Sequence, residues 1–412
     1  MSARGLKAKA PSPINSFLPY GRQVIEDDDI AAVAEALRGD LLTTGPFVAR
    51  FEQALAQTVA ADHAVVCANG TGALHMAARA LNLSAGTTVV VPAITFLATA
   101  SAPHLNGAEI VFADVDPETG LMRPSDLEEA LAHAGKADAV FNVHLNGQCG
   151  ALEDIADLAK TYGARVVDDA CHALGTGYVA KDGSIVPIGA NRFCDVSVFS
   201  FHPVKTIAMG EGGAVTANDP TLVKGLQQAR NHGMTRDPAS FANKDDAFDD
   251  NGEANPWYYE MIEPGFNWRA NDMQCALGLS QLKKLSRFVT RRRALAATYD
   301  ALLAEYAPVI RPLGRTRPCL PAWHLYVARI DFEALGKPRA GVMRALAAEG
   351  IGTQVHYYPV HRQPYYAQRY GHQTLPGADR YYERCLSLPL YPTMSDSDPE
   401  RVVRALGKHL GF

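Results

Sequence analysis

Short apolar runs alternate with segments of helical periodicity from residue 24 to about residue 260, and this alternation restricts the fold more than any other feature. The segments between the runs, such as Gly72–Leu83 and Leu152–Tyr162, place apolar residues near a period of 3.6. Strand–helix alternation of this kind predicts βαβ units and a mostly parallel sheet with helices on both faces. The seven predicted strands are His63–Ala68, Thr88–Pro92, Ile110–Asp114, Ala139–His144, Arg165–Asp169, Val196–Phe201 and Ala214–Ala217.

The pattern changes after residue 262. A long helical pattern is followed by a strand, a helix, a second strand and a last helix, predicted at Asn271–Leu303, Ala322–Asp331, Arg339–Glu349, Thr353–Tyr358 and Asp398–Leu410. With 412 residues the chain is too long for one compact core. We therefore predict an α/β protein with a flexible tail (1–15), a large domain on the seven-stranded sheet (16–262) and a smaller α+β domain (263–412).

Charge and cysteine usage narrow the class of function. The formal net charge is −5, so no global positive field exists to hold nucleic acid or an acidic membrane surface. The seven cysteines are scattered and form no CxxC pair, which favours reduced thiols in the cytoplasm over disulfides or a zinc site. No window offers the roughly 18 apolar residues of a membrane helix, and the basic N-terminus lacks the apolar stretch of a secretory signal.

Two segments after predicted strands could each contact a ligand, the first as an anion site and the second through an aromatic side chain. In the first, glycines frame Thr71 where a strand ends and a helix begins, and the free amides and dipole of a helix N-terminus favour an anion. In the second, Phe96 follows the next strand and could stack on a flat heteroaromatic ring. Taken singly, each has an ordinary alternative, a plain strand–helix turn and a core phenylalanine.

A pair of carboxylates, Asp168 and Asp169, ends another apolar strand. Because side chains alternate along a strand, one of the two would point into a site at the sheet's ligand edge. A buried carboxylate there needs a positive partner, and a protonated pyridine nitrogen would serve. His172 could hydrogen-bond the same ligand. The alternative is a pair of loop acids capping the next helix.

Lys205 leaves an apolar strand through Pro203 and reaches a glycine-rich turn. Desolvation at such a place would lower the pKa of the amine and make it nucleophilic. The dense Phe, Pro and Gly around it argue against an ordinary surface lysine, and the turn is no phosphate-binding P-loop because GxxxxGK[ST] is absent.

In order and spacing, these segments resemble the pyridoxal 5′-phosphate (PLP) fingerprint of fold-type-I aminotransferases, and more closely that of the DegT-type nucleotide-sugar aminotransferases. The resemblance covers about residues 17–412. It is carried by NGTGALH, PAITFLATA, VVDDACHALG, SFHPVKTIAMGEGG, RNHGMTRDP, PGFNWRANDMQCALGLSQLKKL and VHYYPVHRQPYY.

This resemblance implies a role for each residue above. Lys205 would hold PLP as a Schiff base and later move the substrate proton, and Asp169 would pair with the protonated pyridine nitrogen. His172 would lie near the ring and its 3-hydroxyl, and Phe96 would stack on the ring. The phosphate would be held by Gly70, Thr71 and Ser200 and by Asn231 of the neighbouring subunit in a symmetric homodimer.

Within the family, the branch that makes UDP-4-amino-4,6-dideoxy-N-acetyl-β-L-altrosamine, an intermediate of pseudaminic acid synthesis, is most similar. The similarity is carried by LPYGRQVIEDDDIAAV, LLTTGPFVARFE, FSFHPVK, PWYYEM, NDMQCALGLSQLKKL and VHYYPVHRQPYY. It implies L-glutamate as amino donor and UDP-2-acetamido-2,6-dideoxy-β-L-arabino-hexos-4-ulose as acceptor. The candidates for lining the sugar-nucleotide pocket are Tyr20, Thr44, His324, His356 and Tyr357.

The chain departs from that branch at a few positions. It has Ala208 and Met209 where the branch usually has two threonines, and Asn69 and Asn231 where it often has serine. Asn69 is common in relatives that make perosamine, so a GDP-perosamine synthase-like enzyme, or another amino-sugar transaminase, stays open as an alternative.

Two other functions within this resemblance are less well supported by the sequence. PLP-type sugar dehydratases of the family carry His where this chain has Lys205, and a non-catalytic PLP sensor is disfavoured by the presence of both Lys205 and Asp169.

His356 and His361 have no third ligand nearby, so we expect no metal. The run Arg291–Arg293 predicts a solvated helix face, and residues 235–256, polar and acidic, predict a solvated loop or a flap over a site.

Overall fold

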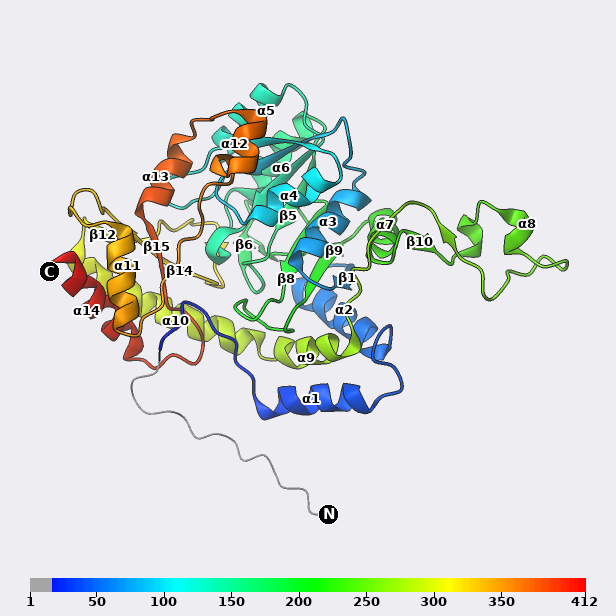
Figure 1. Ribbon diagram of the computed structural model, residues 1–412, viewed down its shortest axis with the longest axis horizontal. Helices are drawn as coiled ribbons and strands as arrows, with labels where there is room; N and C mark the ends of the chain where they lie inside the picture. Colours follow the sequence, from blue (N-terminus) through cyan, green and yellow to red (C-terminus); the bar gives the residue numbers. More distant parts are fainter. Residues whose placement is uncertain (1–16) are drawn as a thin grey trace, which may run out of the picture.

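The computed structural model describes residues 17–412 (Figure 1), so the predicted tail over residues 1–15 lies outside the described part. Seven strands form one sheet in the order β1, β9, β8, β5, β4, β2, β3. β9 runs antiparallel to both of its neighbours, and the other neighbouring strands pair in parallel. The mostly parallel sheet is therefore confirmed. Its strands are β1 His63–Cys67, β2 Thr88–Pro92, β3 Glu109–Ala113, β4 Ala139–Val143, β5 Arg165–Asp169, β8 Val196–Ser200 and β9 Gly213–Ala217.

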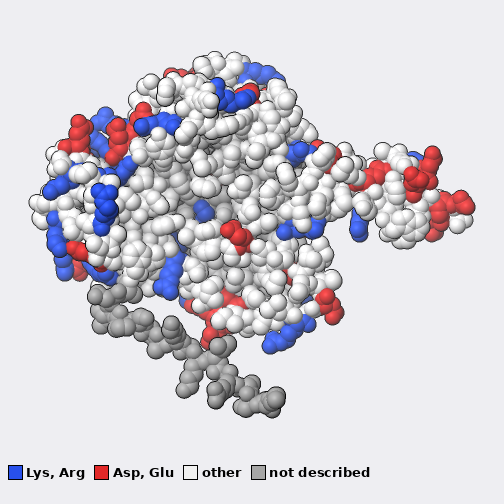
Figure 2. Space-filling model, in the orientation of Figure 1, with Lys and Arg blue, Asp and Glu red and all other residues white. Residues whose placement is uncertain are grey.

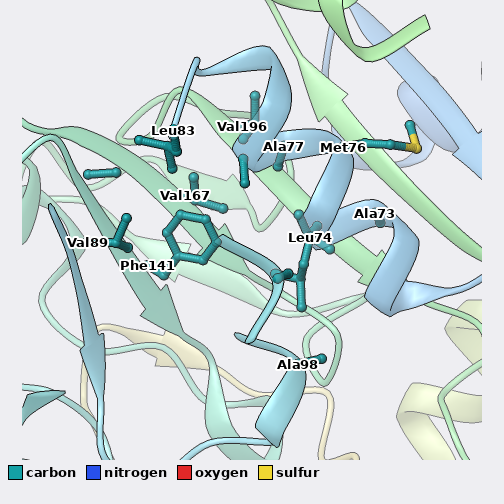
Figure 3. Close-up of a cluster of buried hydrophobic side chains, with 14 of the residues drawn as sticks. Ala73, Leu74, Met76, Ala77, Leu83, Val89, Ala98, Phe141, Val167 and Val196 are labelled. Atoms are coloured by element: carbon teal, nitrogen blue, oxygen red, sulfur yellow. The ribbon is translucent and has the colours of Figure 1, made fainter. Parts of the chain in front are cut away.

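Helices cover both faces of this sheet because its strands are apolar on both sides. On one face, Leu74 of α3 and Ala98 of α4 pack beside Phe141 and Val167 of the sheet (Figure 3). The helices of this face are α3 Gly70–Ala80, α4 Leu97–Leu105 and α7 Pro220–Arg230. Those of the other face are α2 Pro46–Val59, α5 Pro124–Ala134, α6 Leu152–Thr161 and α9 Asp272–Leu282.

The helix predicted over Asn271–Leu303 is divided into α9 and α10 (Leu285–Leu303). At the break, the buried amine of Lys284 donates to Asp28 (2.5 Å) and Asp29 (2.8 Å) of α1 (Asp27–Arg38). The two helices share one core and differ in the second: Cys275 of α9 packs under the large sheet, whereas α10 contributes to both that core and the C-terminal one.

The C-terminal core lies around a three-stranded antiparallel sheet covered by helices. The strands are β12 Ile310–Pro312, β14 Tyr326–Ile330 and β15 Cys385–Leu388, and the helices are α10, α11 Arg339–Ala348 and α14 Asp398–Leu410. Two further helices, α12 Pro364–Tyr370 and α13 Pro376–Arg384, were not foreseen. The domain boundary at residue 262 stays a prediction.

The predicted strand Thr353–Tyr358 is wrong. Only Gln354 pairs, exchanging two backbone hydrogen bonds with Ser387 (2.8 and 3.1 Å). The chain then turns away from β15, and His356 and Tyr357 line a cleft in place of extending the ladder. The apolar and aromatic residues of this segment resemble a strand in the sequence, but their side chains pack around the cleft.

The solvated helix face predicted for Arg291–Arg293 is also wrong for its central residue. Arg292 of α10 is 1% exposed. It can be buried because its guanidinium donates to backbone carbonyls of Trp323, His324 and Leu390.

Residues 234–261 form an arm that projects from the body (Figure 1). Its base is the antiparallel pair β10 (Met234–Thr235) and β11 (Glu260–Met261), and α8 (Lys244–Ala247) lies near its tip. Acidic side chains gather at the tip (Figure 2), where the sequence places Asp245, Asp246, Asp249, Asp250 and Glu253.

A smaller sheet joins β6 Gly177–Val179, β7 Ile185–Pro187 and β13 Cys319–Leu320. No helix within residues 17–412 has the length and apolar character needed to cross a bilayer.

Candidate active site

A cleft of about 910 Å³ opens where the parallel strands end, as expected for ligand sites on such sheets. It brings together side chains from both ends of the chain. The candidate residues that line it are Tyr20, Gly70, Thr71, Phe96, Asp169, His172, Ser200, Lys205, His324, His356 and Tyr357. Thr44 and Asn231, which the sequence also singles out, lie outside it.

Lys205 reaches the cleft from the loop between β8 and β9. The loop is closed by backbone hydrogen bonds from Phe201 to Gly212 (2.8 Å) and from Met209 to Phe201 (2.9 Å), and Phe201 is anchored in the core against Phe51. Burial lowers the pKa of the Lys205 amine, although nearby Cys171 and Asp169 act in the opposite direction. A larger fraction of the amine is therefore neutral and nucleophilic than for a lysine in water.

The two carboxylates at the end of β5 point to opposite faces of the sheet. Asp169 lines the cleft, is 6% exposed, and accepts a 2.6 Å hydrogen bond from the Thr99 hydroxyl of α4. Asp168 faces away, where it contacts His144 (3.1 Å) and accepts from the Asn142 amide (3.1 Å). Burial acts to lower the pKa of His144, but the Asp168 carboxylate outweighs it and raises that pKa.

The N-terminus of α3 forms one end of the cleft. Asn69 caps the helix by accepting from the Gly72 amide (2.8 Å), and the first turn leaves other backbone amides without helical partners. Gly70 lies against Ser200, since a Cβ at position 70 would come within 2.8 Å of the Ser200 Cβ. With the hydroxyls of Thr71 and Ser200, this corner has the donors that a phosphate requires.

His172 is held in one protonation state by its neighbours. Its Nδ1 accepts from the Asn146 backbone amide (3.2 Å), so the neutral ring carries its proton on Nε2, 3.1 Å from the Tyr357 hydroxyl. Burial and then the charges of Lys205 and His356 lower the pKa of His172 well below its ordinary value. Phe96 lies across the mouth, half exposed, with its ring centroid 6.0 Å from that of Tyr357.

Tyr20, His324 and His356 also line the cleft. The ring of His356 lies 5.3 Å from that of Tyr20, and its Nδ1 is 2.8 Å from the Ser387 hydroxyl. Burial lowers the pKa of His356 to about 3 and that of His324 well below its ordinary value. These groups are therefore neutral at pH 7 and suited to hydroxyl and carbonyl partners.

Thr44 and Asn231 lie near a second hollow of about 270 Å³. Thr44, Arg230 and Arg269 line it, and Arg269 donates to the Asn231 side-chain oxygen. One chain therefore does not bring either residue to Lys205, and their assigned roles stay predictions that require a second subunit.

Comparisons with known proteins agree with this geometry. Residues 23–407 match the model of the DegT/DnrJ/EryC1/StrS aminotransferase family. The chain belongs to this family. Among its relatives, the spore coat polysaccharide biosynthesis protein SpsC of Bacillus subtilis (strain 168) is 38% identical over 399 residues, covering 95% of this chain and 97% of SpsC.

Solved structures of the family are similar along almost the whole length. Helicobacter pylori PseC, an aminotransferase involved in the biosynthesis of pseudoaminic acid, superposes with a TM-score of 0.84 at 28% identity, covering 96% of this chain and 99% of PseC. The putative sugar aminotransferase Spr1654 of Streptococcus pneumoniae, in its PLP form, gives 0.82 at 25% identity, with 96% and 98% covered. It has also been solved in a PMP form. The protein is thus a PLP-dependent sugar aminotransferase of the DegT family.

The residues of the cleft fit this cofactor. A buried carboxylate at Asp169 matches a protonated ring nitrogen, the α3 corner matches a phosphate, and Lys205 offers a partly neutral amine to the aldehyde carbon. Glycine is required at position 70, because a Cβ there would collide with the Ser200 side chain at the phosphate corner.

Thr99 is a site residue that sequence reasoning missed. It stands three residues after Phe96 in TFLATA, but nothing local shows that α4 lies across the end of β5. Trp268, Thr95 and Cys171 also line the cleft without having been singled out. Only the packing of distant segments identifies them.

Thr99→Val is expected to weaken cofactor retention and lower turnover by about tenfold. The substitution keeps the shape and removes one hydrogen bond to the Asp169 carboxylate, and bonds to charged groups contribute roughly 1.5–3 kcal/mol. The measurement is turnover together with PLP retained after dialysis. Thr58→Val, which removes an exposed hydroxyl bond within α2, is the control; equal behaviour of the two variants would contradict the role of Thr99.

Proposed function

We propose that this aminotransferase moves the amino group of L-glutamate to C4 of a nucleotide-linked 4-keto-6-deoxy sugar, UDP-2-acetamido-2,6-dideoxy-β-L-arabino-hexos-4-ulose. The cleft around Lys205 carries the proposal. At about 910 Å³ it lies near the top of the roughly 300–1,000 Å³ range of small-molecule pockets. Its lining offers neutral hydroxyl and imidazole groups suited to a hydroxylated sugar. The similarity to PseC supports the particular sugar.

The residues have separate tasks in this reaction. When bound, PLP accepts an amino group from a donor and passes it to a keto acceptor. Lys205 holds the cofactor covalently between turnovers and then moves the proton at the substrate carbon that gains or loses nitrogen. Asp169, oriented by Thr99, stabilises positive charge on the ring nitrogen. His172 fixes the Tyr357 hydroxyl within the cleft that would hold the ring.

Tyr20, His324 and His356 are proposed to orient the sugar. All three line the cleft, and the neutral state of both imidazoles allows each to donate and accept at once. Neutral groups of this kind can hydrogen-bond the hydroxyls of the sugar without attracting the negatively charged diphosphate of the nucleotide.

The proposed active unit is a symmetric homodimer in the cytoplasm. Thr44, Asn231 and Arg269 lie around the second hollow, away from the cleft of their own chain. In the dimer, Asn231 would reach the phosphate of the neighbouring subunit, and Thr44 would join its sugar-nucleotide pocket.

A GDP-linked perosamine precursor is the second candidate acceptor. It is favoured by Asn69, whose side chain caps α3 directly beside the phosphate corner. The nucleotide and the stereochemistry at C4 distinguish the two candidates.

Spectra and an acceptor panel test the proposal. L-Glutamate alone is expected to bleach the visible absorbance of the PLP enzyme and release one equivalent of 2-oxoglutarate, and the UDP-linked keto sugar is expected to restore the absorbance. Restoration by the GDP-linked 4-keto-6-deoxymannose alone would move the assignment to the second candidate. Failure of both sugars after bleaching would overturn both acceptors, and failure to bleach would overturn the donor.

A further inference from the structure

Arg292 is a buried cation without an acidic partner. It is 1% exposed, and within residues 17–412 no carboxylate forms an ion pair with it. Burial lowers the pKa of its guanidinium to about 10, so the group keeps its charge at neutral pH. Its neighbours behave differently: Arg291 pairs with Asp396 (2.5 Å), and Arg293 is exposed. Because burying an unpaired charge costs free energy, the interactions that hold Arg292 need an explanation.

The guanidinium joins two segments of the cleft wall. Its Nη1 donates to the carbonyl oxygens of Trp323 (3.3 Å), His324 (3.1 Å) and Leu390 (2.9 Å). The first two belong to the turn that presents His324 to the cleft. Trp323 in that turn has a φ of +50°, a conformation that residues other than Gly, Asn and Asp seldom adopt, so the turn needs external support.

The third carbonyl leads to Tyr20. The Leu390 amide donates to the Tyr20 carbonyl (3.0 Å), so Arg292 is connected to the backbone of Tyr20 through one residue. Arg292 and Lys205 also line the same narrow gap. The Arg292 side chain is thus connected to the backbone of His324 directly and to that of Tyr20 through Leu390.

We propose that Arg292 is a positioning residue of the aminotransferase, tying the His324 turn and the segment that holds Tyr20 into one rigid wall facing the acceptor. The inference rests on the proposed function only in taking a keto sugar as the molecule that meets this wall. Arg292 does not reach the cleft surface and so acts through the two side chains that it supports.

The charge of Arg292 has a second, measurable consequence. Burial is the largest cause of the lowered pKa of His324, and positive charge on any of His172, Lys205, Arg292 and His356 lowers it further. Removing the guanidinium charge therefore raises that pKa. The low-pH limb of acceptor turnover, where His324 becomes protonated, would then move to higher pH.

The test compares Arg292→Met, Arg292→Lys and Arg293→Met. The first removes donors and charge, and the second keeps the charge with fewer, differently placed donors. The third is a matched control, because Arg293 also donates to carbonyls of this loop, at Leu320 (3.0 Å) and Pro321 (2.8 Å), but from the exposed side. Each variant is assayed for the glutamate half-reaction by bleaching, for KM and kcat with the acceptor across pH, and for melting temperature.

Arg292→Met is expected to lower kcat/KM for the acceptor by about tenfold or more and to shift its low-pH limb upward, while bleaching by glutamate changes by less than about threefold. Arg292→Lys should recover the wild-type pH limb and part of the rate, and Arg293→Met should match wild type. The series uses whichever keto sugar the wild-type enzyme turns over, so a wrong acceptor shows in the wild type and a wrong role for Arg292 shows only in the variants.

The proposal is overturned if folded Arg292→Met retains wild-type acceptor kinetics and pH profile, or if it loses both half-reactions equally. Should Arg292→Met fail to fold, Arg292→Lys decides: an acceptor-specific loss relative to Arg293→Met supports the role, and wild-type kinetics contradict it.

Discussion

Lys205→Ala is expected to lower turnover by at least about a thousandfold and to abolish the visible absorbance of the lysine-linked cofactor. Proton transfer by a positioned side chain contributes roughly 10²–10⁴-fold, and the covalent attachment of PLP is lost in addition. The half-buried amine has no role in holding the fold, since none of the described residues accepts a side-chain hydrogen bond from it. The melting temperature should therefore stay near that of the wild type. Turnover, absorbance and melting are measured on the same preparation.

The control for this substitution is Lys283→Ala, an exposed lysine between α9 and α10, which should leave both spectrum and rate unchanged. Addition of a small primary amine should restore part of the rate in Lys205→Ala, because the missing proton acceptor is supplied from solution. Retention of a tenth or more of wild-type turnover in Lys205→Ala would show that another amine performs the reaction.

Asp169→Asn is expected to lower turnover by about a hundredfold or more and to weaken PLP retention. The amide keeps the size of the carboxylate but removes the charge that faces the ring nitrogen, and breaking a buried charge pair costs roughly 3–5 kcal/mol. Rate and cofactor content after dialysis are the measurements, with Asp168→Asn as the matched control on the same strand.

Asp168→Asn should spare cofactor binding and reduce stability, because Asp168 faces His144 on the other side of the sheet. The pKa of His144 is raised in the folded protein, so its stabilising contribution is complete below its ordinary pKa of 6.5 and is lost as pH rises through the raised value. The difference in melting temperature between Asp168→Asn and wild type should accordingly shrink at high pH. If Asp168→Asn loses PLP while Asp169→Asn keeps it, the two carboxylates have been assigned the wrong way round.

The sequence by itself determined the sheet, because strand and helix periodicity are local properties. All seven predicted strands begin and end within one residue of those observed. The turns that carry the chemistry were equally visible, since Gly70-Thr71-Gly72 and the loop after Val196–Ser200 place glycine and proline where the backbone must turn near a ligand. These features also carried the family resemblance, and family membership established the cofactor.

Only the tertiary structure decided which distant residues complete the site. The contact of Thr99 with Asp169 and that of Tyr357 with His172 join positions 70 and 185 residues apart, and no local pattern encodes such a pairing. The same holds for Thr353–Tyr358, whose alternation suggests a strand, and for Arg292, whose two flanking arginines suggest solvent. In both cases the surroundings override the local pattern, because a cleft and a set of backbone carbonyls supply partners that the neighbouring sequence does not contain.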